Sequence, residues 1–150
     1  MEGRMVTSVG NPVSARNQIS GRVIGIQKGA AMSVVTISAD GQQLISAITN
    51  QAVEELDLKT NDSVLALVKA SDAMLIKGDM GSLKISARNK IGGRVSEIQK
   101  GNAMACVTVD GGSWKVTSSI TRQAVDDLQL KYGDAVTAIF KATEVLLQKA

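Results

Sequence analysis

An internal repeat is the feature that most constrains how this 150-residue chain can fold. The tetrapeptide Ser-Ala-Arg-Asn occurs at residues 14–17 and again 72 positions later, at residues 86–89. The same offset relates Gly-Arg-Val at residues 21–23 and 93–95, and Ile-Gln-Lys-Gly at residues 26–29 and 98–101. No insertion or deletion is needed, and roughly half of the aligned residues are identical, which indicates a duplicated module.

The repeat divides the chain into four parts. We expect a flexible leader over residues 1–13, a first domain over residues 14–77, a linker over residues 78–85 and a second domain over residues 86–150. Each domain is near the lower size limit for independent folding, so we expect the modules to gain stability by burying surface against other modules. This favours a homo-oligomer.

Within each copy the apolar pattern is typical of strands. In the first copy, residues 19–25 alternate, residues 32–37 are rich in β-branched side chains, and Asp40-Gly41 is a hairpin signal. Residues 44–48, 64–68 and 73–76 give three further strands, whereas residues 49–56 have a polar cap and helical spacing. The order predicts an all-β fold of tandem OB-like five-stranded barrels, with one short helix per repeat.

The composition argues against catalysis. The chain has no His, the most common general base and transition-metal ligand. The acidic pairs at residues 54–55 and 126–127 are expected near the start of the helices, where carboxylates stabilise the helix dipole. Gly-rich phosphate loops are absent from the sequence. We therefore expect a binding protein and not an enzyme, with no cofactor and no metal site.

Location and macromolecular partners follow from other features of the composition. A single Cys and the lack of any apolar run of about 18 residues favour a cytoplasmic protein with no membrane partner. Aromatic residues make up 2% of the chain and the net charge is +3. Both values argue against nucleic acid as a partner, because OB-type nucleic-acid binders stack bases on aromatic rings and carry clustered cations.

Hydrogen-bond donors recur together in both copies. Each copy repeats Ser-x-Arg near its start, Ile-Thr before the helix, and Lys-Ala-Ser or Lys-Ala-Thr after the fourth strand. Hydroxyl groups, cations and backbone N–H groups suit a bound oxyanion. The same cations could instead be surface charges kept by duplication, or lysines that protect a strand edge. Spacing alone leaves both interpretations open.

At these residues the sequence closely resembles the molybdate-binding Mop domains of the molbindin family, in the two-domain form, over residues 14–77 and 86–149. The resemblance implies an OB-like fold and binding of molybdate or tungstate, the metal being held only as its oxyanion. It implies that Ser-x-Arg of one domain meets Lys-Ala-Ser of a neighbouring domain, in a trimeric assembly. The implied ligands are Ser14, Arg16, Thr49, Lys69, Ala70 and Ser71, and in the second copy Ser86, Arg88, Thr121, Lys141, Ala142 and Thr143.

The resemblance also implies further anion sites near a three-fold axis, for which Ser46 and Ser118 are candidates by repeat position. A role in intracellular molybdenum storage or homeostasis is the leading interpretation. The alternative is the ligand-sensing half of a molybdate-responsive transcription regulator, and an OB-type nucleic-acid binder is a third.

Overall fold

The structure is a computed structural model that describes residues 13–78 and 83–150. The expected leader falls almost wholly on residues 1–12, and most of the expected linker on residues 79–82, both outside the described residues. The first repeat forms β1 (Asn17–Lys28), β2 (Met32–Ala39), β3 (Gln42–Thr49), α1 (Asn50–Glu55), β4 (Ser63–Val68), the 3-10 helix η1 (Ala70–Asp72) and β5 (Met74–Lys77). The second repeat forms β6 (Asn89–Lys100), β7 (Met104–Asp110), β8 (Lys115–Thr121), α2 (Arg122–Asp127), β9 (Ala135–Phe140), η2 (Ala142–Glu144) and β10 (Leu146–Lys149).

The strands and helices follow from local sequence. β2 alternates between buried and exposed residues, as expected for a strand with one face on a core. Thr49 and Thr121 cap the two helices by accepting hydrogen bonds from the backbone N–H groups of Ala52 and Ala124, each at 3.0 Å. At Gly21 an added Cβ would lie 2.5 Å from Ile37 Cγ2, so glycine permits the close approach of β1 and β2. The expected all-β fold of two five-stranded units is confirmed.

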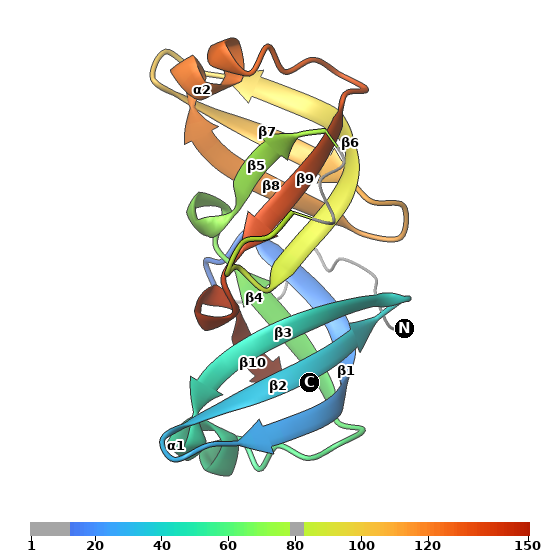
Figure 1. Cartoon of the computed structure of the whole chain (residues 1–150), viewed down its shortest axis with the longest axis vertical. Helices are drawn as coiled ribbons and strands as arrows, with labels where there is room; N and C mark the ends of the chain where they lie inside the picture. Colours follow the sequence, from blue (N-terminus) through green and yellow to red (C-terminus); the bar gives the residue numbers. More distant parts are fainter. Residues whose placement is uncertain (1–12, 79–82) are drawn as a thin grey trace.

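The two repeats exchange their last strands. One sheet has the order β10-β4-β1-β2-β3, and the other has the order β5-β9-β6-β7-β8. The fifth strand of each sheet therefore comes from the other repeat, with Leu147 opposite Ala66 and Leu75 opposite Ala138. In Figure 1 the green β5 lies in the upper unit and the red β10 in the lower one. The proposed domain ranges thus describe sequence repeats, whereas each folded unit contains residues of both.

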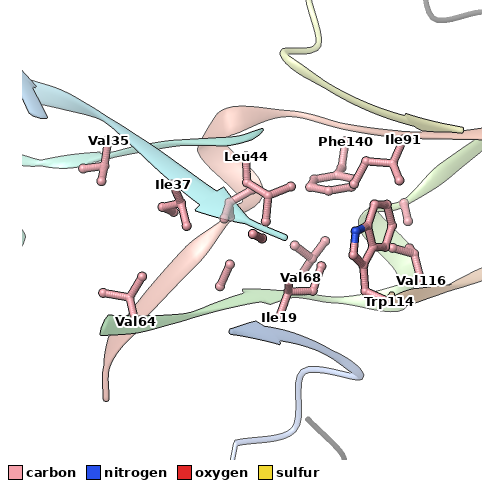
Figure 2. Close-up of a cluster of buried hydrophobic side chains, with 14 of the residues drawn as sticks. Ile19, Val35, Ile37, Leu44, Val64, Val68, Ile91, Trp114, Val116 and Phe140 are labelled. Atoms are coloured by element: carbon pink, nitrogen blue, oxygen red, sulfur yellow. The ribbon is translucent and has the colours of Figure 1, made fainter. Parts of the chain in front are cut away.

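The hydrophobic core continues from one unit into the other. The larger cluster joins first-repeat residues such as Ile37 and Leu44 to Ile91, Trp114 and Phe140 of the second repeat. Figure 2 shows the Trp114 ring and the Phe140 ring close to Leu44. A smaller cluster around Val95, Val107 and Val136 fills the second unit. We call the junction between the two five-stranded units the waist. Because the exchanged strands and the larger cluster both cross it, we expect the two repeats to unfold together.

Lysine side chains fasten the exchanged strands. Lys149 at the end of β10 donates to the carbonyl of Asp57 at 2.7 Å and pairs with Asp62 at 3.3 Å. Lys77 at the end of β5 is the repeat equivalent, and its ammonium lies 3.6 Å from the carboxylate of Asp134.

Among the described residues, no helix is long and apolar enough to span a membrane.

Candidate functional site

The antiparallel pairing of β1 and β4 brings the two donor segments of the first repeat together. Asn17 lies opposite Val68 at the end of this ladder. Arg16 and Lys69 are the next residues beyond the pair, so the backbones of Ser-Ala-Arg and Lys-Ala-Ser leave the sheet at the same end. We call the group formed by Ser14, Arg16 and residues 69–71 the first donor cluster.

The second repeat has the same arrangement. Asn89 lies opposite Phe140 at the end of the β6–β9 ladder, and Arg88 and Lys141 follow directly. Ser86, Arg88 and residues 141–143 form the second donor cluster. The resemblance led us to expect that the two segments of a site come from neighbouring domains. In the single chain the two segments of each repeat lie beside each other, because the strands that carry them are adjacent in one sheet. A contact between segments of neighbouring domains in an assembly stays a prediction.

One buried asparagine lies beside each cluster and holds the adjacent backbone in place. Asn17 is 0% exposed; its Nδ2 donates to the carbonyl of Thr117 at 2.8 Å, and its Oδ1 accepts from the N–H of Thr117 at 2.8 Å. Asn89 pairs in the same way with the backbone of Ile45, at 2.9 and 2.8 Å. Each amide side chain therefore pairs with the edge strand of the other unit, as a neighbouring strand would. This contact holds the adjacent Arg16 or Arg88 at the waist.

The 3-10 helices carry the other half of each cluster. Within η1, the N–H of Asp72 donates to the carbonyl of Lys69 at 3.0 Å, so the chain turns sharply after β4. η1 packs against β8 and η2 packs against β3, and Figure 1 shows both at the waist of the molecule. Ser71 and Thr143 are exposed there, whereas Ala70 and Ala142 are half-buried and can offer only backbone N–H groups.

The clusters are rich in donors, and their cations are not in ion pairs within the described part of the chain. Arg16, Lys69, Arg88 and Lys141 are all exposed, and none is in an ion pair with any residue of the described part of the chain. Arg88 folds back and donates to the carbonyls of Ser86 and Ile85, at 3.2 and 3.0 Å. Cations that lack a carboxylate partner are available to a small anion.

Thr49 and Thr121 do not join these clusters in the single chain. Both cap helices at the ends of the molecule, opposite to the waist (Figure 1). Asn17 contacts Thr117, and Thr121 lies four residues farther along β8, which corresponds to about 13 Å. A tetrahedral oxyanion is too small to bridge that distance. Thr121 instead lines an open hollow of about 450 Å³ together with residues that include Asn102 and Arg122.

The hydroxyl groups of Ser46 and Ser118 already donate hydrogen bonds within the fold. Both are 0% exposed. The Ser46 hydroxyl donates to the carbonyl of Val145 at 2.6 Å, and the Ser118 hydroxyl donates to the carbonyl of Ala73. These bonds join β3 and β8 to the segments that lead into the exchanged strands. Their protons are therefore not available to an axial anion in this arrangement.

The helical carboxylates differ from expectation. Neither α1 nor α2 has an acid in its first turn, because the acidic pairs at residues 54–55 and 126–127 are the last two residues of these six-residue helices. They do not stabilise the helix dipole as we expected. Asp126 instead pairs with Lys100 at 3.1 Å on the surface.

Sequence reasoning missed the role of the two asparagines. They stand next to Arg16 and Arg88 in the repeated tetrapeptide, and their identity in both copies was the available signal. That signal does not distinguish a ligand from a buried polar side chain that pairs with a distant strand.

Known proteins share this architecture. Residues 13–75 and 85–147 each match the TOBE domain. The molybdenum transport protein ModE of Herbaspirillum seropedicae is 34% identical over 137 residues, which are 89% of this chain and 50% of ModE. Molybdenum-pterin-binding protein 2 of Clostridium pasteurianum is 38% identical over 65 residues, which cover 43% of this chain and 96% of that protein.

A solved structure matches both repeats of this chain together. The cytoplasmic molybdate-binding protein ModG, with molybdate bound, superposes with a TM-score of 0.86 at 34% identity, over 93% of this chain and 99% of ModG. The chain spans about half the length of the first curated relatives that it matches, the ModE proteins. The resemblance drawn from the repeated motifs is thereby confirmed. The relatives named here are binding and regulatory proteins and not enzymes. The chain belongs to the TOBE domain family and carries two TOBE (Mop) domains in tandem.

Proposed function

We propose that the chain binds molybdate, or its close analogue tungstate, at its two donor clusters. The observation that carries this proposal is the placement of Arg16 with Lys69, and of Arg88 with Lys141, beyond the ends of equivalent strand ladders. None of the four cations pairs with a carboxylate among the described residues. The relatives support the choice of anion, since ModG is described with molybdate bound.

The chemistry of the clusters suits a fully deprotonated dianion. Molybdate at neutral pH carries only acceptor oxygens, and the clusters offer Arg and Lys N–H groups, hydroxyls and backbone N–H groups. Each charge-assisted hydrogen bond contributes about 1.5–3 kcal/mol net. Four or five such bonds, less the costs of desolvation and ordering, suffice for micromolar affinity, which corresponds to about −8 kcal/mol. Hydrogen phosphate is disfavoured because its P–OH group needs an acceptor.

The roles proposed for the ligands follow their chemistry. Arg16 and Lys69 supply charge, Ser14 and Ser71 supply hydroxyl donors, and Ala70 supplies its N–H. Their equivalents in the second cluster are Arg88, Lys141, Ser86, Thr143 and Ala142.

Completion of the sites requires a second copy of the chain. Thr49 and Thr121 lie too far along β3 and β8 to reach a cluster of the same chain, so we propose that they contribute from a neighbouring protomer. A trimer, as the resemblance implies, supplies such neighbours. Each site then buries its anion between protomers, which strengthens the electrostatic attraction by excluding water.

Intracellular molybdenum storage or homeostasis is the role that we propose, in the cytoplasm. ModG supports it, because 99% of that cytoplasmic protein is matched by this chain. The second candidate is the ligand-sensing half of a regulator. It is favoured by the ModE proteins, of which the matched region is about half.

Isothermal titration with molybdate tests the proposal, with sulfate and phosphate as competing anions. We expect micromolar or tighter binding at both clusters. Replacing Arg16 or Arg88 by alanine should weaken binding about 10- to 100-fold at the cluster that loses its arginine, which is the loss of one charge-assisted bond, and replacing both should weaken it at both clusters. Arg22→Ala is the matched control, because it removes the same charge from β1 where Arg22 donates to the carbonyl of Asn61 at 2.9 Å. Equal losses in the control and the cluster variants would contradict the proposal.

A further inference from the structure

The two donor clusters differ at the acidic residue that follows the hydroxyl position. The first repeat has Lys-Ala-Ser-Asp at residues 69–72, and the second has Lys-Ala-Thr-Glu at residues 141–144. Glu144 and Asp72 are both half-buried and close their 3-10 turns through the same backbone bond, to Lys141 and Lys69 respectively, each at 3.0 Å. The backbone geometry is therefore alike, and the side chains make the difference.

Only the longer side chain returns to the cluster. Oε1 of Glu144 accepts a hydrogen bond from the N–H of Lys141 at 3.3 Å. In the described part of the chain, the carboxylate of Asp72 makes no equivalent bond to the N–H of Lys69, because it is one methylene shorter. The second cluster thus holds a negative charge at the residue that supplies one of its cations, and one of its backbone donors is already occupied.

The arginines of the two clusters also differ in their hydrogen bonds. Arg88 donates to the carbonyls of Ser86 and Ile85 at 3.2 and 3.0 Å, whereas Arg16 makes no such bond among the described residues. Two of the five N–H donors of Arg88 are therefore already occupied before an anion binds. The second cluster is therefore satisfied internally to a greater degree than the first.

We propose that Glu144 sets the second cluster apart as a weaker oxyanion site, so that the chain binds anions in two affinity classes. This inference rests on the proposed function. The carboxylate acts through repulsion of the bound dianion and through its hold on the N–H of Lys141. Glu144 thereby lowers the affinity of the second cluster without contacting the anion itself.

Variants that isolate each cluster test the proposal. Arg16→Ala leaves the second cluster to be measured, and Arg88→Ala leaves the first. In the Arg16→Ala background, Glu144→Gln retains an acceptor for the N–H of Lys141 and removes only the charge. We expect it to tighten molybdate binding about three- to tenfold, the size expected for one partly screened unit charge near a dianion.

The matched control is Asp72→Asn in the Arg88→Ala background, where we expect less than a twofold change. Glu144→Asp, which keeps the charge but shortens the side chain to that of the first repeat, should also tighten binding in the Arg16→Ala background. An unchanged or weaker affinity for Glu144→Gln, or an equal gain for Asp72→Asn, would overturn the assignment of Glu144. Failure of the wild-type chain to bind molybdate or tungstate would overturn the proposed function, and this inference with it.

Discussion

The contact between Asn17 and Thr117 allows a quantitative test of how the two units are held together. Thr117 lies in β8, the edge strand of its sheet, and the amide of Asn17 satisfies its backbone N–H and C=O, both at 2.8 Å. Asn17→Ala leaves these two backbone groups unpaired in a site where Asn17 is 0% and Thr117 4% exposed. Each unsatisfied buried group costs about 1–3 kcal/mol, so the two groups together predict a loss of about 2–6 kcal/mol in the free energy of unfolding.

The second repeat supplies the matched comparison. Asn89 makes the same pair of bonds with Ile45, at 2.9 and 2.8 Å, but Ile45 is only partly buried. Water can therefore replace part of the lost bonding in Asn89→Ala, for which we expect about 1–2 kcal/mol.

Urea unfolding at constant protein concentration measures both variants, because an oligomer makes stability depend on concentration. Trp114, the single tryptophan, is 5% exposed and lies at the waist, so its fluorescence reports the relevant region. A loss below about 1 kcal/mol for Asn17→Ala, or a larger loss for Asn89→Ala than for Asn17→Ala, would refute the reasoning.

Further expectations concern pH and backbone packing. A hydrogen bond from the N–H of Lys59 is the main cause that lowers the pKa of Asp62, with a smaller contribution from Lys149. The stabilisation by Asp62 should therefore be complete above about pH 5 and be lost progressively as the pH falls below the ordinary pKa and through the lowered one, so Asp62→Asn should lower the melting temperature more at pH 7 than at pH 3. Molybdate affinity should be nearly constant between about pH 6.5 and 8 in titration calorimetry, because the chain has no His; a steep change would contradict the ligand set. Gly21→Val should lower the melting temperature by several degrees, because an added Cβ meets Ile37 at 2.5 Å and the carbonyl of Ser38 at 2.9 Å; an unchanged value would contradict this packing.

The sequence was sufficient to predict the strands but not their partners. Alternating polarity and the repeat located the five strands and the helix of each copy, since these depend on local periodicity. The exchange of β5 and β10 was not predictable in this way, because the two strands are equivalent in the repeat and pair with equivalent strands, β9 and β4. Short apolar strands such as these fit either sheet, and the path of the chain through η1 and η2 decides which one they join.

The candidate site was predicted in part. The motifs located the segments around Arg16 and Lys69, and the antiparallel register then brought them together. Thr49 was assigned to the site by resemblance alone. In the single chain it lies far from Arg16 and Lys69, because it caps α1 at the end of β3 that is remote from the cluster. The pairing of Asn17 with Thr117 joins residues 100 positions apart, and no pattern within one repeat reports such a contact.

Anomalous diffraction at a tungsten absorption edge, from crystals grown with tungstate, tests the central claim most directly. The account predicts difference peaks within hydrogen-bonding distance of Arg16 and Lys69, and of Arg88 and Lys141. Peaks confined to other places, such as the open hollow beside Thr121, would contradict the assignment of the donor clusters as the oxyanion sites.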